Sequence, residues 1–419
     1  MATTAPGATR PTGRIAFTYP SFKLYQIARF CIVLATEMQS VAVGWQVYEI
    51  TNRTLDLGLI GLAQFLPGII FLPLSGHTAD RYNRSKVLTV GYVALAICSA
   101  LLLAFTAHGA RAVYPIYVVI GLVGVARAFT GPASPAILPH IVPEDHFEKA
   151  VSWGATFFEV ATILGPAVGG LVYTIFRGAG AVYAVAMAGG VAGAVSMSRV
   201  KLAPRKKKLE ILNWKTVFAG LHYIWREKIV LGSISLDLFA VLLGGAVALL
   251  PAYARDILHT GPWGLGLLRC APAVGAGIMA VFLAHRPLGK RAGMKMLWCV
   301  AGFGVCTILF GVSHSLALSL AALFFVGATD MVSVVVRGIL IQLRTPDEMR
   351  GRVNAVDMVF IGASNELGAF ESGLTAWAFG TVPAVVLGGI GTLVVTALWA
   401  WMFPSLRNAD ELVAPRPKT

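Results

Sequence analysis

Apolar runs long enough to cross a membrane alternate with short polar breaks along almost the whole chain. A helix needs about 20 predominantly apolar residues to span the hydrocarbon core of a bilayer. We predict one transmembrane helix from each of twelve runs, at 23–49, 57–76, 86–107, 113–135, 149–176, 179–199, 229–254, 262–284, 292–312, 315–341, 352–379 and 382–405. The pattern predicts an all-α integral membrane protein with twelve transmembrane helices.

One long polar stretch, 199–228, divides these runs into two groups of six. It contains LAPRKKKLEILNWK, and apolar residues recur at helical spacing over 213–227. That spacing predicts an amphipathic helix at the membrane surface. We therefore predict five segments, which are an N-terminal tail (1–22), a six-helix bundle (23–198), this basic linker with its amphipathic segment (199–228), a second six-helix bundle (229–406) and a C-terminal tail (407–419).

The two groups of six also repeat each other in sequence. Laying Pro143–Gly170 over Pro346–Gly373 aligns prolines, acidic pairs and glycines at matching positions. Parallel repeats related by an axis along the membrane normal are typical of secondary transporters, which bind substrate near the midplane between the repeats. The repeat therefore predicts two pseudo-symmetric halves with a site between them.

Composition and charge support a membrane protein. Of the 419 residues, 57% are hydrophobic and 13% are charged, whereas soluble domains carry about 25% charged residues. The net charge of +14 has a topological origin, because most of the 34 Lys and Arg residues fall in the tails and in the loops on the side of the tails. This asymmetry predicts that both termini lie in the cytoplasm, and we expect anionic lipids rather than nucleic acid as the partner of the basic linker.

The sequence contains none of the short motifs that mark common enzyme or metal sites. The five cysteines lie within apolar runs without metal-ligand spacing, and no phosphate loop, dinucleotide fingerprint or HExxH motif occurs. We therefore expect no enzyme activity, no metal and no cofactor, and a proton gradient as the energy source.

Ionisable residues within the apolar runs are the strongest functional signal, because each costs free energy in the membrane unless it is paired or hydrated. Counting about 1.5 Å per residue places five near the midplane, namely Glu37, Arg127, Glu159, Asp330 and Glu366. We expect Arg127 with Glu37 or Glu159 in the first half, and Asp330 with Glu366 in the second half, to line a cavity and to couple transport to protons. A buried acid favours its neutral form and so can carry a proton.

Other polar residues within the runs have simpler explanations or roles. Snorkelling or structural ion pairing explains those nearer a membrane surface, namely Arg29, Asp237, Arg269, Arg337, Asp357 and Glu371. Uncharged groups that can hydrogen-bond a substrate are Gln39, Gln46, Gln64 and Asn365.

Two motifs resemble those of the major facilitator superfamily. The loop GHTADRYNRSK resembles the loop between helices 2 and 3 of these transporters, and the resemblance implies a conformational clasp of Gly76, Asp80, Arg81 and Arg84. An ordinary positive-inside loop is the alternative. The run GPAVGG resembles the GPxxGG motif of helix 5 in proton-coupled drug exporters, and it implies a hinge of Gly165, Pro166, Gly169 and Gly170, with Arg127 assisting proton exchange. Ala161 departs from the usual glycine, and simple helix packing is the alternative.

Longer segments are similar to the enterobactin-exporter branch, which includes macrolide-efflux proteins. They include LYQIARFCIVLATEMQSVAVGWQVYEIT and TPDEMRGRVNAVDMVFIGASNELGA. The resemblance implies a monomeric exporter of a small amphiphilic compound, such as a siderophore, a macrolide-like drug or a metabolite, in a bacterial cytoplasmic membrane. A proton-independent facilitator of lysophospholipid and a membrane receptor that does not transport are the alternatives.

Overall fold

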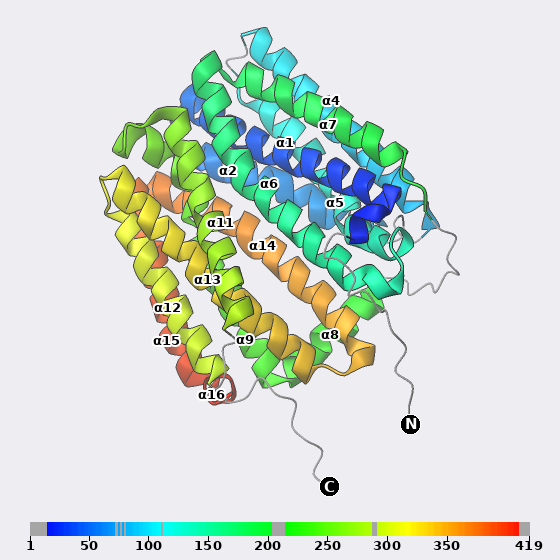
Figure 1. The fold of residues 1–419 in the computed structure, drawn as a ribbon. Coiled ribbons are helices and arrows are strands. Elements are labelled where there is room, and N and C mark those ends of the chain that lie inside the picture. The colour runs from blue at the N-terminus through cyan, green and yellow to red at the C-terminus, as the bar shows by residue number, and fades with distance from the viewer. Residues whose placement is uncertain are drawn as a thin grey trace.

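The computed structural model describes residues 15–71, 74–75, 78, 81–109, 112–202, 214–286 and 291–409, with side chains from 219 onward in the segment that begins at 214. Over these residues the secondary structure is helical, with no strand. Figure 1 shows the helices gathered into two bundles, and the start of α1 and the short α16 lie toward the same end of the molecule.

The first bundle contains six long helices, α1 (Pro20–Thr51), α2 (Thr54–Ile70), α4 (Arg84–Ala107), α5 (Tyr114–Ile137), α6 (Phe147–Phe176) and α7 (Ala179–Ser198). Short 3-10 turns accompany them at η1 (Ile15–Thr18), η2 (Leu138–His140) and η3 (Glu144–His146). Within the bundle α1 packs against α6 and α7, whereas α4 packs against α5 and α7. Asn52 ends α1 in the left-handed conformation, with φ of 51°, which asparagine tolerates better than most residues.

The second bundle contains α9 (Lys228–Gly244), α11 (Gly261–His285), α12 (Ala292–Gly311), α13 (Leu316–Arg344), α14 (Asp347–Phe379) and α15 (Thr381–Met402), followed by the short α16 (Pro404–Arg407). Beyond α9 the chain continues through η4 (Ala246–Leu249), α10 (Leu250–Ala252) and the π-helical η5 (Tyr253–Ile257). Here α13 packs against α11 and α12, and α15 packs against α9 and α12.

Most of these helices have the length and composition of membrane spans. Ten helical segments are long and apolar enough to cross a bilayer. α2 is apolar but has 17 residues, and α14 has 33 residues but is too polar to join the ten. The structure therefore confirms a multi-pass all-helical fold, and the number of twelve spans stays a prediction.

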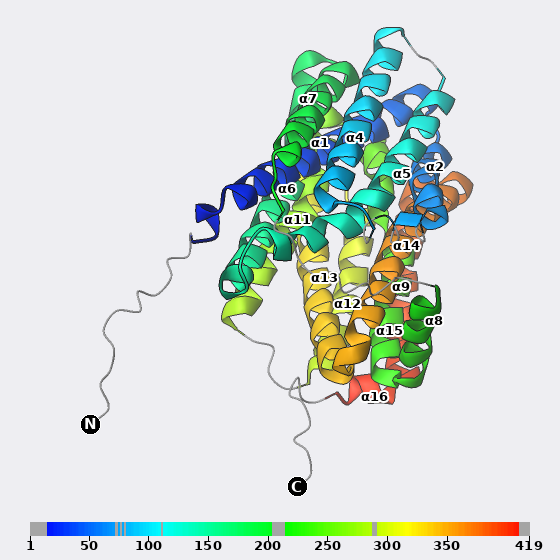
Figure 2. The same ribbon diagram turned by 90° about the vertical axis from the view of Figure 1, so that its right-hand side faces the viewer.

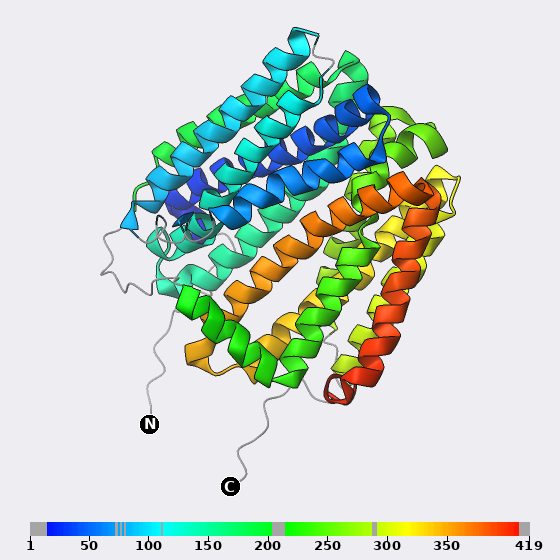
Figure 3. The same ribbon diagram turned by 180° about the vertical axis from the view of Figure 1, so that it is seen from behind.

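The two bundles meet along two helix pairs, α2 with α14 and α6 with α11. Figure 3 shows α2 and α14 side by side. The helices come very close, because a Cβ at Gly373 would lie 2.7 Å from Gly58 Cα and one at Gly170 would lie 3.0 Å from Gly266 Cα. Small residues allow such backbone approach in membranes. Gly58 is near the start of α2, directly after α1 ends, so this packing joins the bundles toward the end of the molecule opposite the start of α1.

The predicted amphipathic segment forms α8 (Trp214–Arg226), which packs against α14 and α9 of the second bundle (Figure 2). Ile224 is fully buried, and Tyr223 Oη donates to the carbonyl of Arg344 at 2.5 Å. Burial raises the pKa of Tyr223, so its hydroxyl keeps the proton that it donates. The linker helix is thus fixed to the second bundle.

Candidate functional site

A cavity of about 540 Å³ lies between the two bundles, which is within the range of small-molecule sites. Its lining comes from α1, α2 and α5 of the first bundle and from α9, α11, α12, α13 and α14 of the second. The charged residues that line it are Glu37, Arg127, Asp237, Arg269, Asp330, Arg337 and Glu366. Both halves therefore contribute charge to one space, as a site that alternates between two sides requires.

Four of these residues form a group across the interface, which we call the cross-half group. Glu37 and Arg127 belong to the first bundle, and Arg269 and Glu366 belong to the second. Each acid interacts electrostatically with both arginines, yet within the described part of the chain none of the four forms a direct ion pair. Gln64 Nε2 donates to Glu366 Oε1 at 2.6 Å, which joins α2 to α14 across the interface.

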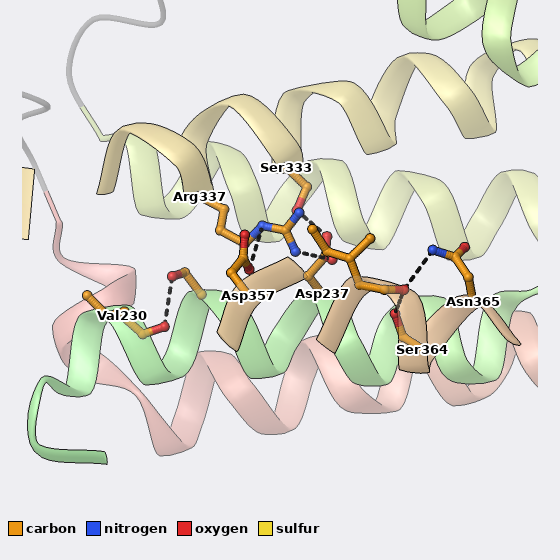
Figure 4. A network of polar contacts seen from close by, with 9 residues as sticks. Val230, Asp237, Ser333, Arg337, Asp357, Ser364 and Asn365 are labelled. Carbon is orange, nitrogen blue, oxygen red and sulfur yellow. Dashed lines mark hydrogen bonds and ion pairs between the residues drawn. The ribbon is translucent and has the colours of Figure 1, made fainter. Parts of the chain in front are cut away.

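A second set of charges lies wholly in the second bundle (Figure 4). Arg337 is bonded directly to Asp237, and its Nε lies 3.6 Å from Asp357 Oδ1. Ser333 Oγ also donates to Asp237 Oδ1 at 3.4 Å. The side chains of Arg337 and Asp237 are only 5% and 7% exposed, so this network confirms the prediction of structural ion pairing for these three charged residues.

The structure places four of the five predicted coupling residues in the cavity lining, and Glu159 is the exception. α6 contributes no residue to the lining, and Glu159 lies against α11, where a Cβ at Gly277 would be 3.7 Å from its Cγ. Asp330 and Glu366, predicted together as cavity-lining residues of the second half, both line the cavity. The charged groups that act on Asp330 are Asp237 and Arg337.

Three of the four predicted polar residues also line the cavity, namely Gln39, Gln64 and Asn365. Gln46 does not. Its Nε2 donates to Thr106 Oγ1 at 3.0 Å and its Oε1 accepts from Tyr183 Oη at 2.7 Å. Gln46 therefore joins α1 to α4 and α7 inside the first bundle, which explains why the sequence contains an amide there.

The predicted hinge motif lies where α6 meets two helices at once. A Cβ at Gly165 would be 2.4 Å from Glu37 Cβ, and one at Gly169 would be 2.8 Å from Met38 Cα. On another side of the helix, a Cβ at Gly170 would be 2.5 Å from the carbonyl oxygen of Pro262. The motif, with Pro166 inside it, is thus a close-packed contact to α1 and α11, and its role as a hinge stays a prediction.

The predicted clasp is described only in part. Gly76 and Asp80 lie outside the described residues, and Arg81 is exposed. Arg84 Nη1 donates to the carbonyl of Ala136 at 2.7 Å and lies 2.7 Å from His140 Nε2. This arginine therefore joins the start of α4 to the end of α5, while the conformational role of the whole motif stays a prediction.

Sequence reasoning missed Arg269, which was assigned to the residues nearer a membrane surface. It lines the cavity, and its Nη1 donates to Ser40 Oγ of the opposite bundle at 2.5 Å. The sequence signal that could have placed Arg269 in the cavity is its position several residues inside a long apolar span. Because depth alone cannot show which face a residue occupies, the partner across the interface could not be predicted.

A polar contact also joins the bundles at the end opposite the termini. Tyr48 Oη in the last turn of α1 donates to Asp256 of η5. Arg255 donates to the carbonyl of Tyr48 at 3.2 Å and lies over its ring at 5.7 Å. Together with the α2–α14 and α6–α11 contacts, this cluster joins the two bundles at that end.

Known proteins match the chain over nearly its full length. The family described as "Transmembrane secretion effector", a branch of the major facilitator superfamily, matches residues 15–417. The enterobactin exporter EntS of Shigella boydii serotype 4 is 25% identical over 403 residues, covering 93% of this chain and 94% of the relative. EntS of Escherichia coli K12 is 24% identical over 404 residues, with the same coverage.

Among solved structures, a mutant of the nucleoside transporter NupG aligns with a TM-score of 0.74 at 11% identity, covering 92% of this chain and all of that one. A bacterial homologue of the human lysosomal transporter Spinster, described as inward-facing and unoccupied, aligns with a TM-score of 0.71 at 12% identity, covering 95% and 99%. These likenesses agree with the fold and with the family match. The chain belongs to the transmembrane secretion effector family of major facilitator superfamily transporters.

Proposed function

We propose that this transporter is a proton-coupled exporter of a small amphiphilic compound, such as a siderophore, a macrolide-like drug or a related metabolite. The observation that carries the proposal is the cavity between the halves, in which Glu37, Glu366 and Asp330 form no direct ion pair among the described residues. A carboxyl group without a fixed cation can exchange a proton, whereas one held in an ion pair resists protonation. The similarity to enterobactin exporters supports export as the direction.

We further propose that the structure is the state open to the cytoplasm. The bundles pack together at the end opposite the termini, and the excess of Lys and Arg near the termini supports a cytoplasmic location for them in a bacterial inner membrane. The alignment with a structure described as inward-facing supports the same assignment. Rocking of the halves would then open the Tyr48–Asp256 end.

The experiment uses purified protein in liposomes that contain a pH-sensitive dye. Siderophores, macrolides and cationic dyes are added in turn, and proton movement is recorded across an imposed pH gradient. We expect proton movement that depends on the added compound, and loss of this signal in Glu37→Gln, Asp330→Asn and Glu366→Gln. Glu371→Gln is the matched control, because Glu371 lies on α14 outside the cavity lining and binds Thr375 Oγ1 at 2.7 Å.

Two results would contradict the proposal. Compound transport that is unchanged in all three cavity variants would remove the acids from the coupling step. Transport that moves no protons at all, together with lipid transfer between leaflets in the same vesicles, would favour a lipid facilitator instead.

A further inference from the structure

Arg269 reaches from one half of the transporter to the other. It belongs to α11, and its Nη1 donates to Ser40 Oγ of α1 at 2.5 Å. Gly44, one turn further along α1, lies beside the same guanidinium, because a Cβ there would be 3.8 Å from Arg269 Nη2, and all three residues line the cavity. The contact therefore sits at the wall of the cavity and must change when the halves move apart.

The contact with Ser40 does not use all the hydrogen-bond donors of the Arg269 guanidinium. Its Nε is buried and has no hydrogen-bond partner, although a guanidinium has five N–H donors. A buried donor without an acceptor is unfavourable. The opposite charges that act on it are Glu37 and Glu366, and among the described residues neither forms a direct ion pair with it in this state.

Glu37 lies on the same side of α1 as the present partner of Arg269. Ser40 follows Glu37 by three residues, which places the two side chains on one face of the helix, and Ser40 Oγ donates to the Glu37 carbonyl at 2.9 Å. Three residues correspond to a rise of about 4.5 Å. A displacement of that size along α1 would carry the guanidinium from the Ser40 hydroxyl to the Glu37 carboxylate.

The other neighbours of Glu37 restrict what it can bind. α6 packs directly on Glu37 through Gly165, because a Cβ there would lie 2.4 Å from Glu37 Cβ. No binding partner can therefore reach Glu37 from the side of α6. α7 approaches α1 through Gly189, at Cys31 and Ala35, two or more residues before Glu37. The charged groups that act on Glu37 are Arg269 from α11 and Arg127 from α5.

We propose that Arg269 is a positioning residue that moves between Ser40 and the Glu37 carboxylate, and that its arrival at Glu37 expels the transported proton. The inference rests on the proton exchange proposed above. The O–H bond of the neutral Glu37 carboxyl breaks, its electron pair stays on the carboxylate oxygen, and the proton passes to water in the cavity. While Arg269 is bound to Ser40, as in this structure, Glu37 is free to hold a proton.

The test measures the protonation of Glu37 directly and needs no cargo. Dicyclohexylcarbodiimide modifies carboxyl groups in their protonated form, and mass spectrometry of the Glu37 peptide gives the extent of labelling at each pH. In Arg269→Gln the pH at half-labelling should move toward alkaline values by about one unit or more, the size of the effect of a nearby opposite charge. In Ser40→Ala it should move toward acidic values, because Arg269 loses its alternative partner.

Arg29→Gln is the control for loss of a cationic side chain within a span, because Arg29 binds the Gly154 carbonyl and lies outside the cavity lining. Arg269→Lys should give an intermediate shift. If Arg269→Gln does not elute as a single species, the labelling midpoints of Ser40→Ala and Arg269→Lys test the inference in its place. Labelling midpoints that match the wild type in every folded variant would overturn the inference.

Transport of a compound that moves protons in the wild type gives the second readout. If Arg269 acts through Glu37, any proton exchange that remains in Glu37→Gln should be unchanged in the double variant Glu37→Gln/Arg269→Gln, whereas independent roles reduce it further and give additive losses. Additive losses would overturn the inference. A shifted labelling midpoint without any compound-dependent proton movement would instead contradict the proposed function and leave the switch itself intact.

Discussion

The contact between Gly373 of α14 and Gly58 of α2 offers a direct test of how the halves close. A Cβ at Gly373 would lie 2.7 Å from both the N and the Cα of Gly58 and 2.9 Å from the Thr54 carbonyl oxygen. All three are backbone atoms, so a side chain cannot simply rotate out of the way. Gly373→Ala therefore forces the two helices apart, and we expect it to disfavour the state with this end closed.

The size of the effect follows from the cost of inserting one methyl group into a packed interface. Such overpacking costs about 1–3 kcal/mol, and about 1.4 kcal/mol changes an equilibrium tenfold. Because the open state relieves the clash, the ratio of open to closed molecules should rise by roughly 5-fold to 150-fold. The two glycines meet outside the cavity lining, so this shift requires no change in the cavity itself.

The assay measures distances between spin labels placed on the two halves at the end opposite the termini. Gly373→Ala should move the distance distribution toward longer values. Gly362→Ala on the same helix is the matched control, because a Cβ there meets nothing within 4 Å while the gain in helix propensity is the same. A Gly373→Ala distribution that matches both the wild type and Gly362→Ala would refute the reasoning.

Three further predictions test other contacts. Arg337→Leu leaves the buried Asp237 and the partly buried Asp357 without their cation and should cost about 3–5 kcal/mol in thermal unfolding. Arg350→Leu, which breaks the largely exposed pair with Asp347, should cost less than about 1 kcal/mol, and equal losses would contradict the burial of the network. Tyr223→Phe removes the bond from α8 to α13 and should lower stability by about 1 kcal/mol, with unchanged melting as the contrary result. Tyr48→Phe should release Asp256 and lengthen the same spin-label distances, and an unaltered distribution would speak against a latch there.

The fold could be predicted largely from sequence because the membrane allows few solutions. Backbone groups in hydrocarbon must bond internally, so apolar runs of spanning length can only be helices in a chain of this composition. The repeat of Pro143–Gly170 in Pro346–Gly373 then predicted two related halves. α14 shows where the argument weakens, because its many polar residues, of which Ser364, Asn365 and Glu366 line the cavity, lower its hydropathy below that of an ordinary span.

The site was predicted less completely, because depth in the membrane does not determine which face of a helix a residue occupies. Glu159 has the depth of a cavity residue but lies against α11, and Gln46 bonds within the first bundle. Arg269 shows the opposite error, since its reach across the interface depends on Ser40 of another helix. Pairings between distant helices are set by packing, which one sequence does not display.

The two sets of charge in the cavity differ in how far their hydrogen-bonding capacity is used. Arg337 is bonded to Asp237 and also faces Asp357, so moving it would leave one buried and one partly buried acid without their cation. Such a network stabilises one arrangement and resists exchange. Arg269 has a single neutral partner and a spare buried N–H, and its movement to Glu37 would satisfy charges that are now apart. Exchange requires two arrangements of similar free energy, and this condition favours the cross-half group over the network of the second bundle as the place where a proton is taken up and released.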